Sequence, residues 1–239
     1  MIGDGDERVR LVEDEALEAG SVVANSSMNR ERVLRGGNGY VRELGRDPVE
    51  LLAGRADCSD DRRPLRWLDL CCGQGLALAS AADELDQAGR PNVTITGLDL
   101  VDDFAAEARR HDRVELVRNS IREWEPADRF DLITCVHGLH YVGDKLGALS
   151  RIASWLTSEG ELIANFDATS VRLRDGRPAG RRLTNALRAA GFHPDARRRR
   201  IGLDGCCQVE LPYRYLGADP DAGPNYTGQP AVHSYYEEA

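Results

Sequence analysis

Long apolar runs and a surplus of positive charge are both missing from these 239 residues. No apolar stretch approaches the roughly 18 residues needed to span a bilayer, so we expect no contact with a membrane. The 31 basic residues are outnumbered by 40 acidic ones, which gives a net charge of −9. Such a chain is a poor general binder of nucleic-acid backbones. The acidic N-terminus also lacks the charged-then-apolar order of a secretory signal.

Metal-type cysteine spacings are absent as well. Two pairs of cysteines, Cys71–Cys72 and Cys206–Cys207, are sequence neighbours, and none of the six cysteines forms a C-x-x-C pair. Adjacent cysteines are badly placed to bridge each other. We therefore expect reduced thiols, no metal site and a cytoplasmic protein.

Strand-like and helix-like segments alternate through the middle of the chain. The apolar segments 65–70, 93–99, 114–117, 130–136 and 161–166 are predicted strands. Helical segments are predicted between several of them, at 76–88, 104–110 and 146–156. This alternation is typical of an α/β fold with a parallel sheet covered by helices on both faces.

The two ends of the chain differ from this middle part. Residues 1–55 are predicted to form an N-terminal arm and a helical lid, with a polar break at 54–64. Asp204-Gly205 is a strong two-residue turn signal, so we expect segments 199–203 and 206–216 to form an antiparallel hairpin. The domain then covers residues 56–216, and residues 217–239 form an extended tail.

A turn of small residues follows the first predicted strand. It has the sequence Leu68-Asp69-Leu70-Cys71-Cys72-Gly73-Gln74-Gly75. Small residues let a ligand approach the backbone where parallel strands end. The dinucleotide fingerprint is absent because Leu78 occupies the position of its third glycine, and no Walker lysine is present. The alternative is a tight turn without a ligand.

The second predicted strand ends at Asp99. An acidic side chain at this position is suited to accept hydrogen bonds from both hydroxyls of a ribose. The alternative is a helix N-cap, although Asp102 and Asp103 are better placed for that role. Turn and carboxylate together predict a nucleoside ligand without a strong pyrophosphate site.

With these motifs, residues 65–192 resemble the class I S-adenosylmethionine-dependent methyltransferases. The turn resembles the first motif of that family, which usually has a glycine in place of Cys71. Gly97-Leu98-Asp99-Leu100 resembles its acidic strand end, and residues 130–141 resemble its fourth motif. The resemblance implies a Rossmann-like seven-stranded sheet, with five parallel strands, a C-terminal antiparallel hairpin, helices on both faces and an N-terminal helical cap.

The resemblance also implies S-adenosylmethionine as the cofactor. The residues expected to bind it are Tyr40, Asp69, Cys71, Gly73, Gly75, Asp99, Leu100, Ser120, Ile121 and Val136. One position departs from the family, which often carries an aspartate for the adenine amino group after the third strand. Here Ser120 would have to bind that group through a neutral oxygen.

Two histidines follow the fourth predicted strand, where the substrate crevice is expected. His137 and His140 are candidate catalytic bases, because an imidazole has a pKa near neutral. The alternative is a packing role. Candidate substrate-binding residues are Arg30, Tyr141, Asn165 and Asp167, and the tail segment 223–228 is expected to cover the site or to be disordered.

The expected activity is methyl transfer to an oxygen, nitrogen or carbon atom of a small molecule. A methyltransferase acting on RNA or protein is the alternative among enzymes, and the arginine run 197–200 is its best support. A non-catalytic S-adenosylmethionine-binding protein is a further alternative. A nicotinamide-dependent oxidoreductase is disfavoured by the missing third glycine.

Overall fold

The computed structural model describes residues 9–20, 30–58 and 63–239. Its strands are β1 (Leu65–Leu70), β2 (Val93–Asp99), β3 (Val114–Arg118), β4 (Phe130–Cys135), β5 (Leu156–Asn165), β6 (Val171–Leu173), β7 (His193–Asp195), β8 (Arg200–Asp204), β9 (Tyr213–Asp219) and β10 (His233–Glu238). Its α-helices are α1 (Asp14–Glu18), α4 (Tyr40–Leu44), α5 (Pro48–Cys58), α6 (Leu76–Gln87), α7 (Ala106–Arg109), α8 (Lys145–Ser154) and α9 (Gly180–Ala189). Short 3-10 turns η1 (Gly138–His140) and η2 (Ala168–Ser170) follow β4 and β5.

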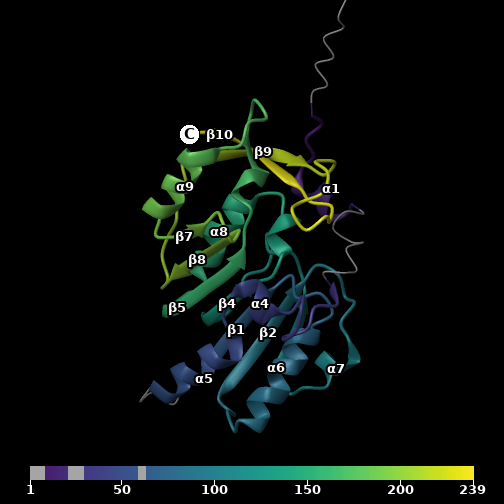
Figure 1. The fold of residues 1–239 in the computed structure, drawn as a ribbon, viewed down its shortest axis with the longest axis vertical. Helices are drawn as coiled ribbons and strands as arrows, with labels where there is room; N and C mark the ends of the chain where they lie inside the picture. The colour runs from purple at the N-terminus through teal and green to yellow at the C-terminus, as the bar shows by residue number, and fades with distance from the viewer. Residues whose placement is uncertain (1–8, 21–29, 59–62) are drawn as a thin grey trace, which may run out of the picture.

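A seven-stranded sheet forms the centre of the molecule, in the order β3-β2-β1-β4-β5-β8-β7 (Figure 1). The strands from β1 to β5 pair in parallel, and β8 runs antiparallel to both β5 and β7. The strand order reverses between β1 and β4. Ligands of open α/β sheets bind at such a reversal, beside the carboxyl ends of the strands. The expected seven-stranded α/β sheet is confirmed.

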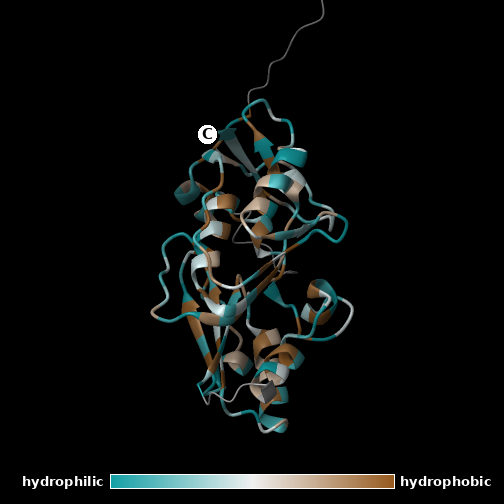
Figure 2. Cartoon of the chain, turned by 90° about the vertical axis from the view of Figure 1, so that its left-hand side faces the viewer, coloured by the Kyte–Doolittle hydropathy of each residue, from teal (hydrophilic) through white to brown (hydrophobic). Residues whose placement is uncertain are grey.

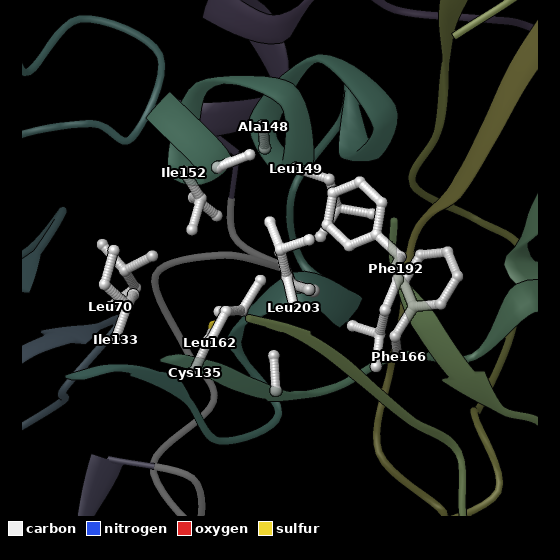
Figure 3. Packing of buried hydrophobic residues seen from close by; sticks show 14 of the residues in the cluster. Leu70, Ile133, Cys135, Ala148, Leu149, Ile152, Leu162, Phe166, Phe192 and Leu203 are labelled. Atoms are coloured by element: carbon white, nitrogen blue, oxygen red, sulfur yellow. The ribbon is translucent and has the colours of Figure 1, made fainter. Parts of the chain in front are cut away.

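Alternate side chains of the central strands enter two separate cores. Leu132 of β4 packs in a cluster with residues of α4, α5 and α6, whereas its neighbour Ile133 packs in a cluster with residues of α8 and α9. Figure 3 draws part of the second cluster, in which Ile133 lies near Leu70 and below Ile152 of α8. Figure 2 shows the central strands largely in brown between more hydrophilic loops. This burial on both faces explains why the strands are nearly continuous apolar segments.

The expected hairpin around Asp204-Gly205 is wrong. The antiparallel pair is β7 with β8, and its connection is the arginine-rich segment 196–199 rather than the Asp-Gly dipeptide. Residues 206–211 contain no strand, and β9 belongs to a different sheet. The Asp-Gly signal failed because β8 already uses both of its edges, pairing with β5 and β7, so no edge is left for β9.

A small second sheet, β6-β10-β9, includes both ends of the segment expected as a tail, in β9 and β10. β10 runs parallel to β6 and antiparallel to β9. Lys145 of α8 holds the start of β10 in place, because its Nζ donates hydrogen bonds to the Val232 carbonyl at 2.9 Å and to Ser234 Oγ at 2.9 Å. Figure 1 shows this sheet at the top of the view, beside α1. The C-terminal residues are therefore part of the folded body.

The polar break expected at 54–64 is displaced, since α5 continues to Cys58. Residues 59–62 lie outside the described part of the chain, as do residues 1–8 and 21–29 of the expected arm and lid. Among the described helices, none has the length and apolar character needed to cross a membrane.

Candidate active site

The turn after β1 is held in an unusual backbone conformation. Cys71, Gly73 and Gly75 all have positive φ, at 58°, 59° and 74°. Glycine adopts this region freely, whereas a side chain such as that of Cys71 is strained there. A Cβ at Gly73 would come within 2.5 Å of the Cα of Arg30, so glycine is required where the N-terminal segment crosses the turn.

Asp99 lies at the end of β2, next to this turn, and is buried. Its Oδ2 accepts a hydrogen bond from the Gly73 amide at 2.8 Å, and its Oδ1 accepts one from the Val101 amide at 3.0 Å. The guanidinium of Arg30 also donates to Oδ1, at 3.2 Å. The carboxylate is thus fixed by backbone amides from two segments, and Arg30 shares the carboxylate expected to bind a ribose.

A pocket opens beside Asp99 between the main sheet and α1. Its walls include Asp99, Leu100, Ser120, Ile121 and Glu18. Its lining combines a carboxylate, two aliphatic side chains and further polar groups, which suit the diol, the flat base and the amino group of a nucleoside. The residues present therefore fit the adenosyl portion of the expected cofactor, and Cys71 and Tyr141 also line this pocket.

Asp69 and Tyr40, expected to bind the cofactor, contact each other instead of lining that pocket. The Tyr40 hydroxyl donates to Asp69 Oδ2 at 2.7 Å, and Thr134 Oγ1 donates to Oδ1 at 2.5 Å. Burial raises the pKa of Asp69 to about 7, even though both of these hydrogen bonds favour its charged form. Tyr40 belongs to α4, so this pair attaches the helical lid to the end of β1.

His137 is the first residue after β4 and also has a positive φ, at 60°. Its Nε2 lies 2.9 Å from Glu43 Oε2, and its backbone amide donates to Asn165 Oδ1 at 3.2 Å. The contact with His137 lowers the pKa of Glu43. His137 Nδ1 is buried and has no hydrogen-bond partner among the described residues. A strained backbone at a strand end, with one imidazole nitrogen paired and the other open, is a feature of reactive sites.

His140 and Tyr226 lie against His137. The ring centroids of the two histidines are 5.4 Å apart, and that of Tyr226 lies 6.0 Å from His137 and 5.4 Å from His140. The guanidinium of Arg199 stacks over the Tyr226 ring at 4.0 Å. Burial lowers the pKa of His140 to about 3. Tyr226, in the segment 223–228, therefore packs against both histidines.

The other residues that were expected to bind the substrate make contacts within the protein. Asn165 positions its neighbours, because its amide also donates to the Glu43 carbonyl at 3.4 Å. Asp167 accepts from the Thr169 amide at 2.9 Å and so caps a 3-10 turn. Arg30 lies at Asp99, away from the histidines. Val136 is buried in the core and Gly75 precedes α6.

Two carboxylates at the site were not identified from sequence, Glu43 beside His137 and Glu18 beside Ser120. Both come from short N-terminal helices, and no motif marks either residue. Three arginines of the run 197–200, the support for the alternative of an RNA substrate, contact other residues of the chain. Arg198 pairs with Asp195, and Arg200 donates to the Arg42 carbonyl at 2.8 Å.

Residues 39–196 match the model of a family described as a methyltransferase domain. The curated aklanonic acid methyltransferase DauC of Streptomyces sp. (strain C5) is 29% identical over 113 residues. That match covers 44% of this chain and 50% of the relative, so the chain spans about half the length of the protein it matches.

Solved structures with similar folds include two N-methyltransferases. NodS from Bradyrhizobium japonicum WM9, in complex with S-adenosyl-L-homocysteine, is 18% identical with a TM-score of 0.45, covering 79% of this chain and 95% of NodS. Coclaurine N-methyltransferase, bound to N-methylheliamine and S-adenosylhomocysteine, is 23% identical with a TM-score of 0.39, covering 51% and 34%.

Proposed function

Because the chain belongs to the family of methyltransferase domains, we propose that it transfers a methyl group from S-adenosylmethionine to an oxygen, nitrogen or carbon atom of a small molecule. The observation that carries the proposal is the position of Asp99. Its carboxylate is fixed at the end of β2 by the Gly73 and Val101 amides and lines a pocket with Leu100 and Ile121. A carboxylate at this strand end suits a ribose diol.

The chain's own residues hold and orient the cofactor. Asp99 accepts hydrogen bonds from the ribose hydroxyls, while Leu100 and Ile121 flank the adenine. When bound, S-adenosylmethionine supplies an electrophilic methyl group on a sulfonium. Transfer then depends mainly on the positioning of the acceptor and on its loss of a proton, where it has one to lose.

His137 takes the role of the base that removes this proton. Glu43 Oε2 lies 2.9 Å from Nε2 and, as an ionised carboxylate, accepts its N–H. This bond assigns the neutral tautomer in which Nδ1 keeps a lone pair for the acceptor's proton. Glu43 acts through His137 and is a positioning residue.

His140 has a different role. With a pKa of about 3 it stays neutral at physiological pH and is a weak base. Its ring packs against His137 and Tyr226 and so supports the shape of the acceptor side. The name of the curated relative, aklanonic acid methyltransferase, supports a small molecule as the acceptor.

Calorimetry with S-adenosylhomocysteine and, separately, NADH tests the proposal. We expect micromolar binding of the first and none of the second. The protein is then incubated with methyl-labelled S-adenosylmethionine and separate panels of small phenols, acids and amines, RNA, and protein. Label transfer to a small molecule is the expected result. Binding of NADH alone, or of neither ligand, would overturn the proposal. Binding without transfer to any panel would indicate a non-catalytic protein.

A further inference from the structure

Ser120 lies where the cofactor pocket ends, just after β3, and is 5% exposed. Its Oγ accepts a hydrogen bond from the Arg122 amide at 3.1 Å. The same Oγ is hydrogen-bonded to Glu18 Oε1. In that second bond the hydroxyl donates and the carboxylate accepts, because an ionised carboxylate has no proton to give. The Ser120 hydroxyl therefore donates its one proton to the hydrogen bond with Glu18.

Glu18 brings a negative charge to this edge from outside the sheet. It is the last residue of α1, and it lines the same pocket as Ser120 and Asp99. Its second oxygen, Oε2, has no hydrogen bond to any described residue, so it remains available as an acceptor. The arginines of this wall pair with other carboxylates, Arg122 with Glu123 at 2.7 Å and Glu15 at 3.9 Å, and Arg151 with Glu125 at 2.9 Å.

The position of α1 is determined by contacts with the small sheet. Leu17 is 2% exposed and packs with Ala218 and Val232. Val12 exchanges two backbone hydrogen bonds with Ala218, at 2.8 and 2.9 Å. The Tyr215 hydroxyl donates to Asp14 Oδ1 at 2.6 Å. These contacts fix the helix along its length, so the Glu18 side chain meets Ser120 as part of a packed arrangement.

Two other carboxylates line the pocket, and both already accept hydrogen bonds from the protein. Asp14 receives the Tyr215 hydroxyl. Asp144 Oδ1 receives the Gly147 amide at 2.9 Å, as the N-cap of α8, and also the Tyr236 hydroxyl at 2.9 Å. Of these carboxylates, Glu18 is the one that is hydrogen-bonded to Ser120.

We propose that Glu18, held against Ser120, accepts the hydrogen bond of the adenine amino group and makes the site selective for a 6-amino purine. This assignment rests on the proposed binding of S-adenosylmethionine and names a recognition residue outside the matched methyltransferase domain. An amino group donates to the Glu18 carboxylate, whereas an oxo group at the same position would place an oxygen against it. A hydrogen bond to a charged partner discriminates more strongly than one between neutral groups.

The test compares S-adenosylhomocysteine with S-inosylhomocysteine, in which oxygen replaces the 6-amino group. Calorimetry on the full chain measures the ratio of the two dissociation constants. We expect the wild-type protein to prefer S-adenosylhomocysteine by about 10- to 100-fold. In Glu18→Gln the ratio should fall to within a few-fold of 1, because an amide can donate as well as accept. Glu15→Gln is the matched control on the same helix, at a side chain 83% exposed, and should keep the wild-type ratio.

A second variant protects the test against a simple loss of helix docking. In the double variant Glu18→Gln, Ser120→Asp, a carboxylate returns to the same edge from the strand side, and the preference should return. An unchanged ratio in Glu18→Gln, with normal affinity for S-adenosylhomocysteine, would overturn the role of Glu18 alone. Failure of the wild-type protein to bind either nucleoside would overturn the proposed function together with this inference.

Discussion

The proposed cofactor end, around Asp99, and the proposed acceptor end, around His137, are built in different ways. At the cofactor end, Gly73, Asp99 and Val101 lie within 28 positions of one another, and backbone amides hold the carboxylate. At the acceptor end, Glu43 and Tyr226 come from opposite ends of the chain and meet at His137 through side chains. The first end is a product of two neighbouring strands, and the second exists only after the whole chain has folded.

This difference separates two kinds of function. Strand ends in a paired sheet move little, because their backbone hydrogen bonds fix them. They therefore suit a cofactor that is the same for every acceptor. Side chains from separate loops and helices can be exchanged without disturbing the sheet, which suits recognition of a variable acceptor. We therefore expect substitutions at the cofactor end to change binding and substitutions at the acceptor end to change turnover.

The largest effect is expected at the acceptor end. His137→Ala should slow methyl transfer by about 10²- to 10⁴-fold, because the base that accepts the proton is lost. Affinity for S-adenosylhomocysteine should stay within about twofold, since His137 does not line the nucleoside pocket. Single-turnover rates and calorimetry measure the two quantities. An unchanged rate would assign His137 a structural role.

At the cofactor end, Asp99→Asn should weaken S-adenosylhomocysteine binding on the order of 100-fold, since a charged acceptor becomes neutral. Asp102→Asn is a matched control, because Asp102 is exposed and pairs with Arg109. Thermal melting of both variants checks that the fold is retained. Wild-type affinity in Asp99→Asn would break the proposed division between the two ends.

The acceptor end should also make stability depend on pH. Burial lowers the pKa of His140 to about 3, from an ordinary value of 6.5. Between these two pH values the His140 imidazole is protonated in the unfolded chain and neutral in the folded chain. The free energy of unfolding therefore falls as the pH decreases below about 6.5, by up to about 1.4 kcal/mol per pH unit. His140→Phe should remove this contribution. Urea denaturation at pH 5, 6 and 7 measures how the free energy of unfolding changes with pH in the wild-type protein and in His140→Phe. An equal change in both proteins would contradict the effect of burial on His140.

The smallest effect is expected for Tyr226→Leu. Tyr226 is 37% exposed, and its ring carries the Arg199 guanidinium at 4.0 Å. Loss of this contact should raise the KM for the acceptor about two- to fivefold, as expected for a partly exposed cation–π pair. Affinity for S-adenosylhomocysteine is the internal control. A larger change in that affinity than in the KM would mean that the two ends are coupled.

The turn after β1 and the end of β2 at Asp99 could be predicted from the sequence because each signal there is local. The alternation of apolar residues predicts that a strand ends at Asp99. The small residues before α6 predict the turn. The same local logic misplaced the hairpin, since an Asp-Gly dipeptide indicates a turn but not which strand edges remain open. Strand pairing depends on the rest of the sheet.

Glu18 and Glu43 could not be found in this way. Each becomes part of the site through a helix that packs on distant residues, as α1 does on β9, and a single sequence contains no record of that packing. His137 was identified by its place after β4, but its carboxylate partner was not. The left-handed backbone at Cys71 was not predicted either, because a cysteine gives no signal for positive φ.

The docking of α1 on β9 also bears on how the protein is made. Asp14 and Tyr215 are 201 positions apart in the chain, so α1 is synthesised well before the surface on which it packs. Val232, its other support, is made later still. A nascent or truncated chain that already contains the whole main sheet therefore lacks the support for Glu18. The wall that α1 contributes to the pocket is therefore completed only after β9 and Val232 have been synthesised.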